Sequence, residues 1–211
     1  MALLHGDYAP ARGWIPPERT RRLVADTVAR RAGLFPGDIA LVAPCGPGLA
    51  AAPLARAFTR CRVVAADADA RILERCRANA IALDAADRLR PYLADATALP
   101  FEDECFPLVA CAFELHARDD ALDVLDELLR VAFWSGKLIA VEPDFSRLPN
   151  KPAGLARNVF DEDTVGAMKE MGWGKVAVQK IEVLADGTVV QLMSAKRLDG
   201  PEGADRDGDV K

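Results

Sequence analysis

The chain has 211 residues, of which 51% are hydrophobic and 28% are charged, and these proportions are typical of a globular domain with a sizeable core. Its formal net charge of −5 argues against indiscriminate binding of nucleic acid, which uses a basic surface, although a local basic patch would be compatible with this charge. No apolar run reaches the ~18 residues that cross a bilayer, and residues 1–10 lack the apolar centre of a signal peptide, so we expect a cytoplasmic protein with no membrane partner.

The two ends of the chain differ in composition from its middle. We expect residues 1–35 to form an irregular arm followed by a helix, and residues 36–198 to form one domain. Prolines and glycines of the arm surround Tyr8 and Trp14, two aromatic residues that could help to close a lid over a substrate pocket. Residues 199–211 are rich in glycine and aspartate, a composition that predicts a disordered tail.

The domain alternates short apolar runs with stretches in which apolar residues recur at helical spacing. The apolar runs predict strands at residues 39–43, 62–66, 92–94, 108–113 and 138–141. The helical stretches are residues 17–32, 48–59, 69–83, 119–133 and 161–171. Residues 134–137 are expected to turn the chain into the fifth strand. Such an alternation predicts a parallel sheet covered by helices on both faces.

Two more strand-like runs, 176–184 and 189–196, follow the last helix. They are joined by Ala185-Asp186-Gly187-Thr188, and a short Asp-Gly segment between two such runs is typical of a β-hairpin. The sequence therefore predicts an α/β fold with a doubly wound, mostly parallel, seven-stranded sheet that ends in a C-terminal antiparallel hairpin.

The strongest functional signal lies where the first strand ends. The strand breaks at Pro44-Cys45-Gly46-Pro47-Gly48 and is followed by an alanine-rich helical segment. Strand, glycine turn and helix N-terminus form the ligand-cradling corner of a doubly wound domain. The next strand ends in Asp67, whose carboxylate could accept hydrogen bonds from ribose hydroxyls. This pairing predicts a cofactor of the adenosine type.

The cysteines do not indicate a metal site or a disulfide framework. There are five of them with no CxxC spacing, and only His5 and His116 could add imidazole ligands. We expect free, mostly buried thiols of a reducing cytoplasm and no bound metal.

Five motifs, met in order along the chain, carry a resemblance to a known family. They are Cys45–Gly48, Val64–Asp67, Asp95–Phe101, Glu127–Val131 and Ser135–Pro143. Together they resemble a class I S-adenosylmethionine (SAM)-dependent methyltransferase of the small-molecule kind, which includes the ubiquinone/menaquinone biosynthesis C-methyltransferases. The resemblance runs from the first strand to the end of the hairpin. It implies a Rossmann-like methyltransferase fold and SAM as the cofactor.

The resemblance also implies a set of cofactor-binding residues. In the family, the residue matching Asp67 binds the ribose, the one matching Asp95 binds the adenine amino group, and Ala112 and Phe113 fall near the sulfonium. The full set comprises Pro44, Cys45, Gly46, Gly48, Asp67, Ala68, Asp95, Ala96, Ala112 and Phe113.

Methyl transfer from a sulfonium is an in-line displacement, so the enzyme supplies alignment and, for an acceptor that carries a proton, a base. His116, just past the fourth strand, is the candidate base, because its ordinary pKa near 6.5 suits that role. The alternative is a histidine that packs the loop before the next helix. Glu114 and Glu142 are further candidates for substrate contacts, together with Tyr8 and Trp14 of the arm.

Two further hypotheses remain open. The family's acidic residue near the end of the first strand falls on Val42, and its first loop glycine falls on Pro44, which has no N–H donor. A methyltransferase-like protein that binds ligands or partners without turnover would fit these departures. An NAD-dependent dehydrogenase would fit Gly46-x-Gly48-x-x-Ala51. However, a dehydrogenase would usually have a second strand–helix half or a catalytic domain after the fifth strand, where this chain has only a loop, one helix and a hairpin. The motifs specify neither the methyl acceptor nor the oligomeric state.

Overall fold

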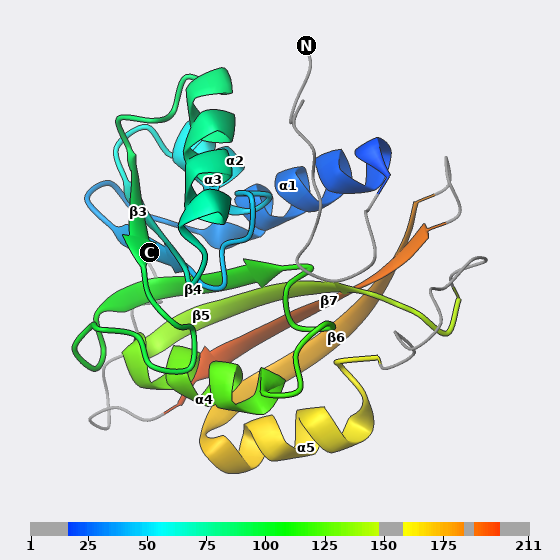
Figure 1. Cartoon of the computed structure of the whole chain (residues 1–211). Coiled ribbons are helices and arrows are strands. Elements are labelled where there is room, and N and C mark those ends of the chain that lie inside the picture. Colours follow the sequence, from blue (N-terminus) through cyan, green and yellow to red (C-terminus); the bar gives the residue numbers. More distant parts are fainter. Residues whose placement is uncertain (1–16, 148–157, 184–187, 199–211) are drawn as a thin grey trace, which may run out of the picture.

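A computed structural model describes residues 17–147, 158–183 and 188–198 of the chain. Within them, seven strands form one sheet in the order β3-β2-β1-β4-β5-β7-β6 (Figure 1). The strands are β1 (Ile39–Val42), β2 (Arg62–Asp67), β3 (Leu89–Leu93), β4 (Phe106–Ala112), β5 (Ala132–Pro143), β6 (Trp173–Val183) and β7 (Thr188–Arg197). The helices are α1 (Glu18–Ala32), α2 (Ala51–Ala57), α3 (Ala70–Ala82), α4 (Ala121–Val131) and α5 (Glu162–Met171).

The predicted α/β fold class is confirmed. Strands β3, β2, β1, β4 and β5 are parallel to one another, and β7 lies antiparallel between β5 and β6. The expected antiparallel hairpin therefore closes one edge of the sheet. The expectations for the N-terminal arm with Tyr8 and Trp14, and for the tail from residue 199, lie outside the described residues.

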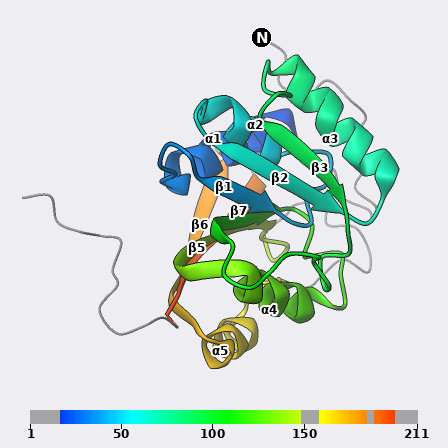
Figure 2. The ribbon, with the colours of Figure 1, turned by 90° about the vertical axis from the view of Figure 1, so that its left-hand side faces the viewer.

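Helices cover both faces of the sheet, and each face has its own core. Helices α1, α2 and α3 lie on one face and α4 and α5 on the other, as both views show (Figures 1 and 2). Alternate residues of β1 point to opposite sides: Ala40 and Val42 join the first core, while Leu41 joins the second. The central strands are apolar nearly throughout because they are buried on both faces.

Several predicted boundaries differ from those of the structure, and two of the differences have an identifiable cause. Residues 134–137 do not form a turn but lie inside β5, where Ser135 has a positive φ of 59° and the pairing with β4 shifts register. A Cβ on Gly136 would lie 2.5 Å from the Phe133 carbonyl oxygen, so the glycine belongs to a bulge in the strand. Helix α2 begins at Ala51 rather than at Gly48, because the glycine turn continues past Gly48.

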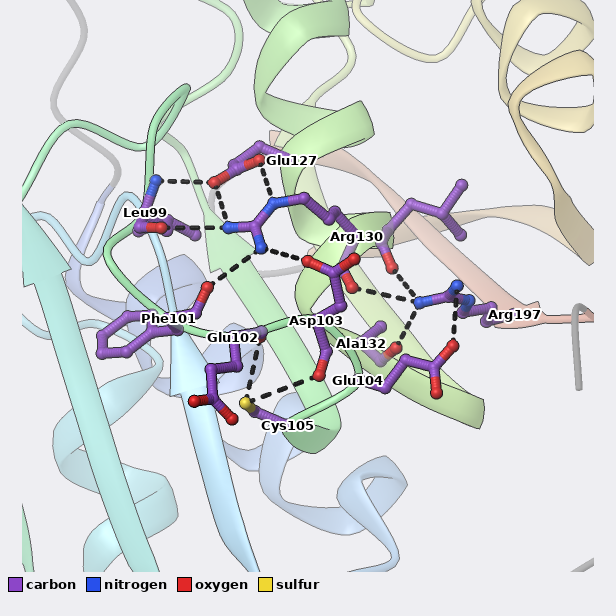
Figure 3. A network of polar contacts seen from close by, with 11 residues as sticks. Leu99, Phe101, Glu102, Asp103, Glu104, Cys105, Glu127, Arg130, Ala132 and Arg197 are labelled. Atoms are coloured by element: carbon purple, nitrogen blue, oxygen red, sulfur yellow. Dashed lines mark hydrogen bonds and ion pairs between the residues drawn. The ribbon is translucent and has the colours of Figure 1, made fainter.

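A network of polar contacts fixes the loop that follows β3 (Figure 3). The Glu127 carboxylate of α4 accepts a hydrogen bond from the Leu99 amide (2.6 Å) and pairs with Arg130 (2.7 Å). Arg130 in turn donates to the carbonyl oxygens of Leu99 (3.0 Å) and Phe101 (2.9 Å). Arg197 of β7 donates to carbonyl oxygens at the end of α4. The Glu127–Val131 motif therefore has a structural role, since it ties one loop of the sheet's carboxyl edge to α4.

We expect Glu127→Ala to lower the free energy of unfolding by about 2 kcal/mol, because it removes the acceptor of the Leu99 amide and the partner of Arg130. Urea denaturation measures the change. The control is Glu102→Ala, an exposed glutamate of the same loop, which should stay within about 0.5 kcal/mol of the wild type. Equal losses in the two variants would contradict this role of Glu127.

Candidate functional site

A cavity of about 450 Å³ opens at the carboxyl ends of the parallel strands. This edge is where open α/β sheets bind ligands, and the volume is sufficient for a small molecule. The lining comes from the segments that follow β1, β2, β3 and β4. It comprises Pro44, Asp67, Ala68, Ala96, Phe113, Glu114, Ala117, Arg118, Asp119 and Asp120.

The glycine turn after β1 is held between the two neighbouring strands. The Ala43 amide donates to the carbonyl oxygen of Ala110 in β4 (3.0 Å), and the Cys45 amide donates to that of Ala66 in β2 (2.8 Å). Gly48 has a φ of 91° and lies so close to α3 that a Cβ would be 2.9 Å from the Cys76 sulfur. Gly48 thus serves close packing of the loop on the helix as well as the conformation of the turn.

Asp67 joins the end of β2 to the glycine turn. Its Oδ2 accepts a hydrogen bond from the Gly46 amide (3.1 Å), and its Oδ1 accepts one from the Asp69 amide (3.1 Å). Asp69, not Asp67, caps α3, because its side chain accepts from the Arg71 amide (2.8 Å). Burial raises the pKa of Asp67, and the two backbone donors offset part of that effect. Asp67 therefore lines the cavity and is not the N-cap of α3.

Glu114 lies directly against the glycine turn. A Cβ on Gly46, whose φ is 49°, would be 1.9 Å from Glu114 Oε1, so only glycine leaves room for this carboxylate. Glu114 as a whole is half-buried, but its Oε1 is shut off from solvent and has no hydrogen-bond partner among the described residues. Burial raises the pKa of Glu114 well above its ordinary value, and the Asp67 and Glu142 carboxylates raise it further. A cation bound beside Glu114 would offset these effects and favour the ionised carboxylate.

Glu142, which is fully buried near the end of β5, organises the loop after β4. Its Oε1 accepts hydrogen bonds from the amides of Glu114 (3.0 Å) and Leu115 (2.8 Å). Its Oε2 lies 2.7 Å from His116 Nδ1, and the His116 ring packs against Phe145 with centroids 5.3 Å apart. Glu142 thus fixes both the backbone of this loop and the orientation of the imidazole.

His116 lines a second, smaller cavity of about 60 Å³ instead of the large one. Arg118 and Asp119 line both cavities, so the two spaces share a wall. Arg118 also pairs with Asp120 (2.7 Å) and lies 3.7 Å from Asp95. Arg118 and Asp120 were not predicted as site residues, and their only local signal in the sequence is their position just past the end of a buried strand.

Asp95 lies beside the large cavity, and its neighbour Ala96 lines it. Asp95 Oδ1 accepts hydrogen bonds from the amide and the hydroxyl of Thr97, both at 3.0 Å. These contacts with Thr97 lower the pKa of Asp95 and keep the carboxylate ionised.

The structure brings most of the predicted site residues to one edge of the sheet. Those that line the large cavity are Pro44, Asp67, Ala68, Ala96, Phe113 and Glu114. Those on the same loops and strand ends but outside its lining are Cys45, Gly46, Gly48, Asp95, Ala112, His116 and Glu142. Tyr8 and Trp14 lie outside the described residues.

The described residues offer neither a metal centre nor a membrane-spanning helix. No group of three histidine, cysteine, aspartate or glutamate side chains in that part of the chain is arranged to hold a metal ion. None of the helices described has both the length and the apolar character needed to cross a membrane.

Comparisons with known proteins find that the region of this site is similar to one family. The family described as "Methyltransferase domain" matches residues 40–136, which span the glycine turn, Asp67, Asp95 and the loop after β4. Those residues match a methyltransferase family, and curated relatives of the chain are named methyltransferases. The family resemblance seen in the sequence is thus confirmed.

Two curated relatives are methyltransferases of small molecules by name. The demethylmenaquinone methyltransferase of Renibacterium salmoninarum is 35% identical over 128 residues, which are 59% of this chain and 47% of the relative. The 27-O-demethylrifamycin SV methyltransferase of Amycolatopsis mediterranei is 31% identical over 179 residues, which are 85% of this chain and 62% of the relative. The chain therefore spans about half to three-fifths of the length of these relatives.

The fold is also found among solved structures. The crystal structure of the 4+2 cyclase SpnF superposes with a TM-score of 0.71 at 17% sequence identity, and the match covers 86% of this chain and 82% of the cyclase. At that identity the likeness shows the shared fold alone.

We expect Gly46→Ala to lower the free energy of unfolding by about 2 kcal/mol, because the new Cβ displaces the Glu114 carboxylate and the positive φ strains the backbone. In a Glu114→Ala background the same change should cost only about 1 kcal/mol, the part due to the backbone. Urea denaturation of the four proteins of this double-mutant cycle measures both costs.

The control for this cycle is Gly166→Ala in α5. No atom lies within 4 Å of the Cβ it would add, so it should raise stability by about 0.5–1 kcal/mol through helix propensity. An identical cost of Gly46→Ala in both backgrounds would show that Glu114 does not occupy this space.

Proposed function

We propose that the protein transfers a methyl group from SAM to a small-molecule acceptor bound at the carboxyl edge of the sheet. The observation that carries the proposal is the corner made by Asp67 and the glycine turn, which lies at the cavity inside the family-matched region. We assign this activity to residues 36–198, with residues 1–35 as an accessory segment, and place the protein in the cytoplasm.

The charge of the cavity supports a cationic cofactor. Asp67, Glu114, Asp119 and Asp120 line it, and Arg118 is the one basic side chain in the described lining. SAM carries a sulfonium and an ammonium group, whereas NAD would bring an anionic pyrophosphate against these carboxylates. This arrangement favours the methyltransferase over the dehydrogenase.

The described residues fit the parts of SAM as the family positions them. Asp67 would hold the ribose hydroxyls, while Asp95 and the Ala96 amide would hold the adenine. Gly46 and Gly48 would shape the loop beneath the amino-acid end, with Pro44, Cys45, Ala68, Ala112 and Phe113 as the remaining wall. When bound, SAM supplies an electrophilic methyl group; the protein's contribution is to align the acceptor with it.

His116 is the proposed general base for an acceptor that loses a proton. Glu142 acts as its positioning residue, because a carboxylate on Nδ1 fixes the orientation of the ring. Glu142 was a candidate for contact with substrate, but its complete burial supports the positioning role instead. Tyr8 and Trp14 remain proposed lid residues.

A small organic molecule is the proposed acceptor. The printed names of both relatives describe methylation of small molecules, a menaquinone precursor and a rifamycin. The net charge of −5 argues against a nucleic-acid acceptor.

A second candidate function is ligand or partner binding without turnover. The observation that favours it is the state of the glycine turn, in which Asp67 holds the Gly46 amide and Glu114 lies against Gly46. Val42 and Pro44, which depart from the family pattern at this turn, favour the same candidate.

Isothermal titration with S-adenosylhomocysteine, the demethylated product of SAM, tests the proposal. We expect binding in the micromolar range, and at least a tenfold weaker affinity for Asp67→Asn, since charge-assisted hydrogen bonds contribute about 1.5–3 kcal/mol. The control, Asp69→Asn, keeps the cap of α3 and should bind like the wild type.

Binding of NAD without binding of S-adenosylhomocysteine would overturn the methyltransferase assignment. Binding of the product analogue without methyl transfer from SAM to any member of a panel of quinols, phenols and macrolactones would favour the second candidate.

A further inference from the structure

The end of β1 lacks the polar groups that the amino-acid end of the cofactor needs. Val42, at the position of the family's acidic residue, is fully buried and can accept no hydrogen bond through its side chain. Pro44, at the position of the first loop glycine, has no N–H to donate. An ammonium group brought to this turn would therefore need an acceptor from another part of the chain.

Glu114 is an acceptor at that place. Its carboxylate lies on Gly46 and lines the same cavity as Asp67 and Phe113. Its Oε1 is buried and has no hydrogen-bond partner among the described residues. A buried carboxylate oxygen without a partner is costly, and because Glu114 lines the cavity, a ligand bound there could supply the missing donor to its carboxylate.

We propose that Glu114 binds the α-ammonium group of the cofactor's amino-acid end and so replaces the acidic residue that Val42 does not provide. This inference rests on the proposed function. An ammonium group offers three N–H donors, and its hydrogen bond to a carboxylate is charge-assisted. Glycine at position 46 then has two functions. It allows the positive φ of the turn, and it leaves space for the Glu114 carboxylate beside the ligand.

The surroundings of Glu114 determine how binding couples to pH. The groups that face it are Asp67 of β2, Glu142 of β5, Arg118 of the loop, Cys45 of the glycine turn and Cys111 of β4. Burial and the two carboxylates raise the pKa of Glu114, while Arg118 opposes them. An ammonium ligand favours the ionised carboxylate, so binding releases a proton, and affinity rises as pH rises through the raised pKa.

The test compares two ligands that differ only at the amino-acid end. S-adenosylhomocysteine carries the ammonium group, and 5′-methylthioadenosine has the same adenosine thioether without it. By isothermal titration, Glu114→Gln should weaken S-adenosylhomocysteine binding about 10- to 100-fold and change methylthioadenosine binding less than about twofold. Glu102→Gln, the same change at an exposed glutamate outside the cavity lining, should change both affinities less than about twofold.

Titrations in buffers of different ionisation enthalpy give a second readout. At pH values below the raised pKa of Glu114, the wild type should release a proton when it binds S-adenosylhomocysteine but not methylthioadenosine, and Glu114→Gln should lose that difference. Urea denaturation of the variant checks that it is folded.

Three results would overturn the inference while leaving the proposed function intact. They are equal weakening of both ligands, unchanged affinity for both, and tighter binding of S-adenosylhomocysteine by Glu114→Gln. Failure of the wild type to bind either ligand would overturn the proposed function itself, and the inference with it.

Discussion

The hydrogen bond between the Gly46 amide and the Asp67 carboxylate joins the ends of two adjacent parallel strands. The Cys45 amide, bonded to Ala66 of β2, fixes the same junction from the main chain. Strand β1 lies between β2 and β4 in the sheet. The position of the turn after β1 therefore determines where side chains at the ends of β2 and β4 can line the cavity. The cavity depends on this junction, since Pro44, Asp67 and Glu114 all line it.

A second buried carboxylate organises the other half of the site. Glu142 accepts hydrogen bonds from the amides of Glu114 and Leu115 and contacts the His116 ring through its other oxygen. Strand β5 therefore fixes the loop that follows β4. Glu114 lies between the two halves, with its backbone held by Glu142 and its side chain resting on Gly46. The carboxyl groups of Asp67, Glu114 and Glu142 lie close enough to repel one another when ionised, and a cationic ligand would reduce that repulsion.

Much of the fold could be predicted from local sequence. Strands buried on both faces are apolar nearly throughout, Asp161 caps α5 by accepting from the Thr164 amide, and an Asp-Gly segment separates the hairpin strands. The segment 134–137 was predicted wrongly as a turn because Gly136 belongs to a bulge. A bulge depends on pairing with β4, a strand that lies far from this segment in the sequence.

The site was predictable only where one segment forms it. Asp67 and the glycine turn carry a local pattern, whereas the contact of Glu114 with Gly46 joins residues far apart in sequence and depends on how β4 ends. For the same reason, Glu142 was identified as a candidate residue but not as the partner of His116. Arg118 has no pattern of its own; its place follows from its pairing with Asp120 and its nearness to Asp95.

A crystal structure of the protein with S-adenosylhomocysteine tests the account most directly. We expect the adenosine in the large cavity with its ribose hydroxyls on Asp67, and the Glu114 carboxylate on the ammonium group beside Gly46. S-adenosylhomocysteine bound elsewhere would contradict the account. So would S-adenosylhomocysteine with its adenosine in this cavity but its ammonium group away from Glu114.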